Sequence, residues 1–169
     1  MSQLKVNSIV PTGGLGTGAY GGVIQVKPVF TNSTTIHTTN TFGDITGLSV
    51  TITPSSTSSK FLIMTCMTLG QSAQGTAIFL NLLRNSTPIA QNSDSTNPCT
   101  STLAFGANTS DTFSYSYHHL DETNLSNLSD ITYKYQIRTN GTGQATVNQR
   151  GIANDLYSTA NLIVFEVSG

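Results

Sequence analysis

Charged side chains are scarce in this sequence. Seven Lys and Arg and eight Asp and Glu residues make up 9% of the 169 residues, where soluble domains carry roughly 25%. The formal net charge is −1, which excludes a basic surface of the kind that binds nucleic acid or an anionic membrane. Ser, Thr and Asn take the surface positions that Lys and Glu usually hold. Because so little charge keeps copies of the chain apart, we expect an oligomer.

Long apolar runs and cysteines are also few. No stretch approaches the ~18 apolar residues of a membrane span. The start, MSQLKVNSIV, has no apolar segment of signal-peptide length, so we expect no export by a signal of its own. Two cysteines are too few for a disulfide framework. We expect free thiols, with Cys66 a small core residue in the run FLIMTCM and Cys99 in a loop; a Cys66–Cys99 bridge is the less favoured alternative.

The sequence is rich in strand signals instead. Short runs of Thr, Val, Ile, Tyr and Phe alternate with polar residues and end at clusters of turn residues. Residues 60–70 are apolar on both faces, which is typical of a central strand. Pro28 marks an edge strand or a bulge. The segment 75–85, GTAIFLNLLRN, has some helical character, but its length and its Gly and Asn flanks favour a strand. No helix-start signal precedes a 3.6-residue period.

These patterns predict an all-β domain over residues 23–169, a jelly roll or β-sandwich of about eight to ten antiparallel strands. Residues 1–22 do not fit that domain. LKVNSIVP could form a short strand by itself, and the Gly-rich run after it cannot pack. We therefore expect an extended N-terminal arm, followed by a hinge at about residues 11–22. The apolar residues of the arm are Leu4, Val6, Ile9 and Val10, and the hinge glycines are Gly13, Gly14, Gly16, Gly18, Gly21 and Gly22.

The hinge contains GTGAYG, residues 16–21, which matches the glycine spacing of a dinucleotide-binding loop. Such a loop must follow a strand and open a helix, because the pyrophosphate lies at the helix N-terminus. Here the run leads into a predicted strand, and no acidic residue stands about 20 residues later at the end of a second parallel strand. We therefore favour the hinge and expect no nucleotide or other cofactor.

Other chemical motifs are weak. His118 and His119 are followed by Asp121 and Glu122, but adjacent side chains on a strand point to opposite faces. We expect solvated polar residues at a strand end, with a metal site as the less favoured alternative. No G-x-S-x-G motif occurs. A carboxylate pair from distant strands remains an alternative, but we expect no enzyme.

Tyrosines offer a further alternative. Exposed aromatic rings can stack on sugars, and the candidates are Tyr115, Tyr117, Tyr133 and Tyr135. At period two, however, such residues are more often core residues or cross-strand partners.

Several stretches of the sequence are distinctive together: LKVNSIVPTGG at the start, GGVIQVKPVF and DITGLSVTITPSSTSSKFLIM in the middle, and LLRNSTPIA and ITYKYQIRTNGTG later. They resemble virion proteins of tailed bacteriophages, above all fibre or appendage proteins of marine and cyanobacterial phages. GLSVTITPSSTSSKFLIM is the most specific, whereas LKVNSI is widespread and indicates attachment to the particle. The resemblance covers nearly the whole chain.

The resemblance implies a non-enzymatic structural protein of the virion, assembled in the host cytoplasm. It implies a trimeric tail or head fibre that docks on other virion proteins through its arm and contacts a host surface glycan or protein. The family brings no catalytic motif, and its receptor-binding residues vary, so no site is carried over. A capsid decoration protein, a carbohydrate-binding module acting without a particle, and a depolymerase fibre are the alternatives.

Overall fold

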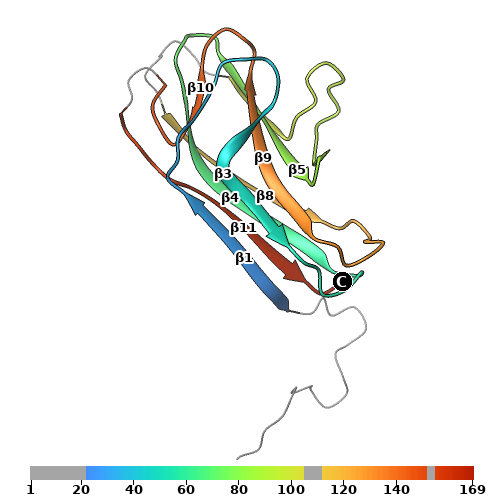
Figure 1. Ribbon diagram of the computed structural model, residues 1–169. Coiled ribbons are helices and arrows are strands. Elements are labelled where there is room, and N and C mark those ends of the chain that lie inside the picture. The colour runs from blue at the N-terminus through green and yellow to red at the C-terminus, as the bar shows by residue number, and fades with distance from the viewer. Residues whose placement is uncertain (1–21, 105–111, 152–154) are drawn as a thin grey trace, which may run out of the picture.

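The chain folds into two antiparallel β-sheets packed face to face (Figure 1). The computed structural model describes residues 22–104, 112–151 and 155–169, and in these ranges it contains eleven strands and no helix. Within the same ranges, accordingly, no helix is long and apolar enough to cross a membrane. The predicted all-β sandwich is confirmed.

One sheet has six strands and the other has five. The six-stranded sheet contains β1 (Val23–Thr31), β2 (Thr35–His37), β4 (Lys60–Gln71), β8 (Thr112–Asp121), β10 (Ala145–Val147) and β11 (Ala160–Val167). The five-stranded sheet contains β3 (Gly43–Ile52), β5 (Ala77–Arg84), β6 (Thr87–Ile89), β7 (Ser101–Ala104) and β9 (Ile131–Thr139). The count exceeds the predicted eight to ten, and β2, β6 and β10 have only three residues each.

β4 is the central strand of the six-stranded sheet, as predicted. On one side it pairs with β8 along almost its whole length. On its other side it pairs first with β11 and then with β10. β1 pairs with β11 at the edge, which is where a strand tolerates Pro28. Val23 at the start of β1 pairs with Val167, so residue 22 and the C-terminus lie at the same end of the sandwich (Figure 1).

The core lies between the two sheets and follows the alternation in the sequence. Leu48, Val50 and Ile52 of β3 are buried, whereas Ser49 and Thr51 between them are exposed. β5 is buried on both faces, and this explains its helix-like run of apolar residues. Its outer residue Phe79, for example, lies 3.8 Å below the guanidinium of Arg138.

A bulge bends β3 in its middle. The pairing of β3 with β9 shifts register between Asp44 and Ser49, and Gly47 within this bulge has φ of 73°. A Cβ at Gly47 would lie 2.7 Å from Oγ1 of Thr31. The bulge therefore needs glycine both for its backbone angle and for the close approach of β1.

These two requirements can be separated by substitution. Gly75 has nearly the same φ, 76°, but a Cβ there would meet nothing within 4 Å. We expect Gly75→Ala to lower the free energy of unfolding by about 1–2 kcal/mol, the cost of the left-handed backbone. Gly47→Ala adds the clash with Thr31 and should cost clearly more. Urea unfolding of the two variants measures the difference, and equal losses would show that the approach of Thr31 is not a constraint.

Candidate interaction surfaces

Most of the predicted arm and hinge lies outside the described residues. This applies to Leu4, Val6, Ile9 and Val10 and to Gly13, Gly14, Gly16, Gly18 and Gly21. Gly22 is the first described residue; it is exposed, and β1 begins directly after it at Val23. The prediction that a strand follows the Gly-rich run is therefore confirmed, whereas a dinucleotide site needs a helix at this position.

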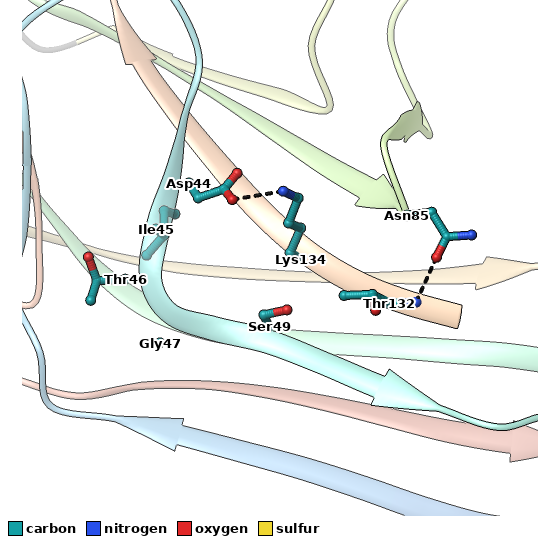
Figure 2. Close-up of a pocket in the computed structure, with 8 residues that line it drawn as sticks. All are labelled: Asp44, Ile45, Thr46, Gly47, Ser49, Asn85, Thr132 and Lys134. Carbon is teal, nitrogen blue, oxygen red and sulfur yellow. Dashed lines mark hydrogen bonds and ion pairs between the residues drawn. The ribbon is translucent and has the colours of Figure 1, made fainter. Parts of the chain in front are cut away.

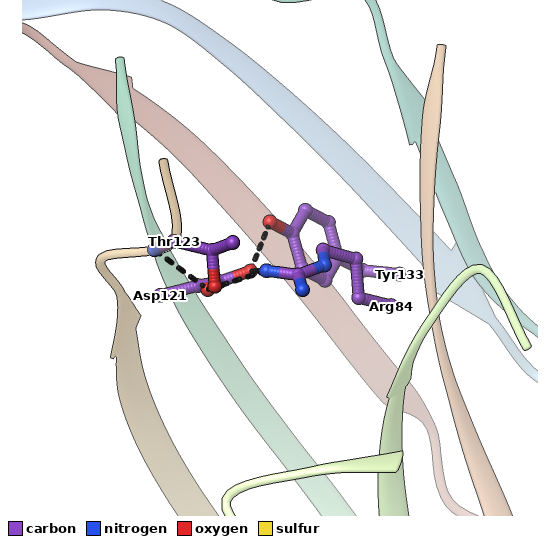
Figure 3. A network of polar contacts seen from close by, with 4 residues as sticks. All are labelled: Arg84, Asp121, Thr123 and Tyr133. Atoms are coloured by element: carbon purple, nitrogen blue, oxygen red, sulfur yellow. Dashed lines mark hydrogen bonds and ion pairs between the residues drawn. The ribbon is translucent and has the colours of Figure 1, made fainter. Parts of the chain in front are cut away.

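Asp121 is the centre of a buried polar cluster that joins the two sheets (Figure 3). Both of its carboxylate oxygens accept hydrogen bonds from Nη1 of Arg84, each at 2.9 Å. The hydroxyl of Tyr133 donates to Oδ2 at 2.8 Å, and the amide and hydroxyl of Thr123 donate to Oδ1. Asp121 ends β8 in one sheet, while Arg84 and Tyr133 belong to β5 and β9 in the other. We call this cluster the Asp121 clamp.

The expectation of a solvated Asp121 at a strand end is wrong, since the residue is only 5% exposed. Burial disfavours the charged carboxylate, but hydrogen bonds from Tyr133 and Thr123 and the charge of Arg84 outweigh it, and the pKa of Asp121 is lowered. The pKa of the Tyr133 phenol is raised, mainly by burial and to a smaller extent by the charge of Asp121. The clamp is an ionised Asp–Arg pair with its remaining acceptor sites filled.

Glu166 forms a second buried polar contact. Its Oε1 accepts hydrogen bonds from the amide and hydroxyl of Ser55 and from the hydroxyl of Ser59, at 2.5–2.7 Å. Gln25 donates to its Oε2 at 2.5 Å. Burial opposes ionisation, but these neutral donors together lower the pKa of Glu166. Glu166 on β11 thus holds the Ser-rich loop between β3 and β4. This loop, PSSTSS, belongs to the stretch whose resemblance to phage virion proteins is the most specific.

The two adjacent histidines lie on opposite sides of β8. His118 faces outward opposite Met64, and His119 stands opposite Ile63, whose side chain is buried in the core. Among the described residues, no group of three or more His, Cys, Asp and Glu side chains could hold a metal ion.

The tyrosines considered for sugar contact are mostly core residues. Tyr133 and Tyr135 are fully buried and Tyr115 is 7% exposed, while Tyr117 is half-buried. Tyr115 and Tyr135 make an edge-to-face contact at 6.5 Å, and burial raises the pKa of Tyr115 to about 12. Three of the four rings are therefore unavailable to a ligand, in agreement with the core interpretation.

Both cysteines are free, but the prediction that Cys66 is a core residue is wrong. Alternation along β4 buries Thr65 and Met67 and turns Cys66 outward. Cys99 lies in a loop, as expected, and is fully buried there. The run FLIMTCM is apolar on both sides of the strand, and composition alone does not show which side meets the core.

A shallow hollow of about 580 Å³ lies on the outer side of the five-stranded sheet, at the β3 bulge (Figure 2). It is lined by hydroxyl and amide groups, including Thr46, Ser49 and Asn85, and by an ion pair. In that pair Lys134 donates to Asp44 at 2.7 Å, and this hydrogen bond is the main reason that the pKa of Asp44 is lowered. The lining contains no aromatic ring, so the hollow offers no stacking platform for a sugar.

The six-stranded sheet presents a very different outer surface. Side chains of β1, β11, β4 and β8 that point away from the core are mostly apolar, and we call this surface the outer face. Its largest exposed members are Val26 at 45%, Phe30 at 66%, Met64 at 42% and Leu120 at 43%. Residues 60–70 are apolar on both faces, as the sequence predicted, and the outward side chains Leu62, Met64 and Cys66 of this strand contribute to the outer face.

Comparison with known proteins gives little further information. No protein-family model matches the chain, and no curated protein sequence matches it. Sixteen chains of solved structures match in shape. One is from the structure of infectious bursal disease virus, Gx strain, with a TM-score of 0.39 and 11% identity over 86% of this chain. The match spans 40% of that chain.

The Asp121 clamp predicts a large effect of a small substitution. Asp121→Asn leaves the Arg84 guanidinium without its counter-charge in a mostly buried position. We expect a loss of about 3 kcal/mol in the free energy of unfolding. Glu122→Gln, next in the chain, is the matched control, because its contact with Lys60 is 3.6 Å long and largely exposed. The control should change stability by less than about 0.5 kcal/mol. Similar losses in both would contradict the clamp.

Glu166 predicts how stability depends on pH. Since its folded pKa lies below its ordinary value of 4.5, its stabilisation is complete above about pH 4.5. It is lost as pH falls through the folded pKa. Glu166→Gln should cost about 2 kcal/mol at pH 7 and progressively less toward pH 3. Urea unfolding between pH 7 and pH 3 measures this. A gap between wild type and variant that is constant with pH would contradict the account.

Proposed function

We propose that this chain is a non-enzymatic structural protein of a tailed-phage virion. In this proposal it is a trimeric tail or head fibre or appendage, docked on another virion protein through residues 1–22, with the β-sandwich facing outward. The assignment to tailed phages comes from the sequence stretches quoted above. The position of β1 supports the separation of the chain into an anchoring arm and a β-sandwich.

β1 begins at Val23, and all members of the described hydrophobic core lie within residues 23–169. The two sheets of residues 23–169 thus build a core of their own, and in this proposal the first 22 residues serve a partner. Because Val23 pairs with Val167, the connection to those residues leaves the sandwich at the end that also carries the C-terminus. The opposite end, with the loops after β4 and after β9, points away from that attachment. An anchor at one end and free loops at the other is the arrangement that a fibre needs.

The sequence LKVNSIV carries four apolar residues, and strand addition to a partner sheet would use its main-chain donors and acceptors. Such docking needs little side-chain specificity, which suits a segment with one charged residue, Lys5, in its first ten. Host contact would then fall to the outward loops. A carbohydrate-binding module has less support, since Tyr115, Tyr133 and Tyr135 are core residues.

Copy number separates the fibre from a capsid decoration protein. A fibre or appendage requires a few dozen trimers or fewer in each particle. A decoration protein clamping neighbouring capsomers requires hundreds of copies. Quantitative mass spectrometry of purified particles against the major capsid protein gives the number, and hundreds of copies would replace the fibre proposal with the decoration one.

Removal of the arm tests the docking role. We expect a chain lacking residues 1–22 to keep its β-type circular dichroism and its oligomeric mass but to be missing from purified particles. Full-length Ile9→Asp is a second variant, expected to dock poorly without any change in chain length. Lys27→Ala, at an exposed residue of β1, is the control and should be incorporated normally. Normal incorporation of the truncated chain would refute docking through the arm.

A further inference from the structure

The exposed apolar side chains of the described residues are distributed unevenly between the two sheets. Eleven large hydrophobic side chains are exposed; three lie in loops, none lies on a strand of the five-stranded sheet, and eight lie on strands of the six-stranded sheet. Those eight are Val23, Ile24, Val26, Phe30, Ile36, Met64, Phe113 and Leu120; Phe113 stands opposite the core residue Leu69 and is not part of the outer face. Single exposed hydrophobics are ordinary, but a contiguous apolar patch marks an interaction site.

Strand register shows that the outer face is contiguous. One row across β1, β11, β4 and β8 consists of Val26, Phe165, Leu62 and Leu120. The next row consists of Pro28, Ile163, Met64 and His118, and the third of Phe30, Asn161, Cys66 and Ser116. Members of a row are cross-strand neighbours about 5 Å apart. None of these twelve residues is Asp, Glu, Lys or Arg.

The outer side of the five-stranded sheet provides an internal comparison. There Thr51 and Thr132 share a hydrogen bond of 2.9 Å across β3 and β9. Next to them Asp44 accepts hydrogen bonds from both Lys134 and Gln136 at 2.7 Å. This is the composition of a sheet surface that faces water. Where the chain itself leaves the outer side of a sheet uncovered, it is therefore polar on β3 and β9 and mostly apolar on the six-stranded sheet; the outer side of β5 is buried within the chain.

We infer that the outer face is covered by a second copy of this chain. The face is uncharged apart from its end, where Lys60 already pairs with Glu122 at 3.6 Å. Two copies can therefore approach without like-charge repulsion and without burying an unpaired charge. A partner that recognised this chain by charge would find nothing to pair with on these rows. Apolar sheet against apolar sheet is also a common packing in proteins.

The size of the outer face suits this partner. Four strands about 4.8 Å apart and about eight residues long, at roughly 3.3 Å per residue, span roughly 20 Å by 25 Å. The accessible area exceeds this projected ~500 Å² because side chains stand out from the sheet. It is therefore on the scale of the ~800 Å² per partner found in specific interfaces.

This inference takes from the proposed function only that the chain is an oligomer, and it names the surface through which copies meet. In a trimer the outer faces of three copies would meet around the three-fold axis, whereas one outer face against another gives a two-fold dimer. The inference does not rest on docking through the arm. The two can fail separately: loss of incorporation on deleting residues 1–22 tests the arm, whereas the mass of the isolated protein tests the outer face.

The test compares two lysine substitutions in the full-length chain by analytical ultracentrifugation. Met64→Lys places a charge in the middle of the outer face, at a side chain that is 42% exposed and so tolerates substitution within a single copy. Leu128→Lys, at a side chain that is 47% exposed in the loop between β8 and β9, is the matched control. We expect an oligomer for wild type and Leu128→Lys, and the 17.9 kDa single chain for Met64→Lys.

An unchanged oligomer for Met64→Lys, folded by circular dichroism, would overturn the inference, as would a monomeric wild type. If Met64→Lys fails to fold, the native thiol decides. Cys66 lies in the third row of the outer face, and the other cysteine, Cys99, is fully buried. The rate of labelling by a maleimide should fall as wild-type concentration rises, and a rate independent of concentration would overturn the inference. Loss of the oligomer on deleting residues 1–22 would instead identify the arm as the cover.

Discussion

The rest of the structure depends on the backbone pairing of β4. This strand bonds to β8 on one side and to β11 and β10 on the other, so that every other strand of the six-stranded sheet is attached to it directly or through one neighbour. Its inward residues Phe61, Ile63, Met67 and Leu69 belong to the core. Its outward residues include Leu62, Met64 and Cys66. A single copy covers one side of this strand, and in our proposal a second copy covers the other.

Two buried carboxylates add connections that hydrophobic packing does not supply. Asp121 ties the end of β8 to β5 and β9 in the opposite sheet. Glu166 ties β11 to the serine loop that connects β3 and β4. Each is fully supplied with donors, which is the condition under which a buried charge is tolerated. In a chain with eight acidic residues, these two serve to fix the sandwich. The surface chemistry is left to Ser, Thr and Asn.

Local pattern was enough to predict the class of fold and most of the strands. The alternation of Leu48, Val50 and Ile52, and of Tyr133, Tyr135 and Ile137, correctly indicated which residues are buried. The polar contacts could not be found in this way, because Arg84 and Asp121 are 37 positions apart and meet only through the packing of two sheets. Cys66 was placed on the wrong side of its strand for a related reason. Where both sides of a strand are apolar, the sequence pattern does not show which side faces the core. The core side is fixed by the neighbouring strands.

The central claim is that the apolar side chains of the outer face, on β4 and its neighbouring strands, are buried between copies of the chain. Oxidation of the wild-type protein by hydrogen peroxide, followed by peptide mass spectrometry, tests it without any substitution. Met67 is 1% exposed in the core and provides the slow reference, and Met64 is 42% exposed in a single copy. The account predicts that Met64 oxidises nearly as slowly as Met67 at high protein concentration and faster on dilution. Rapid oxidation of Met64 at every concentration, with Met67 protected, would contradict it.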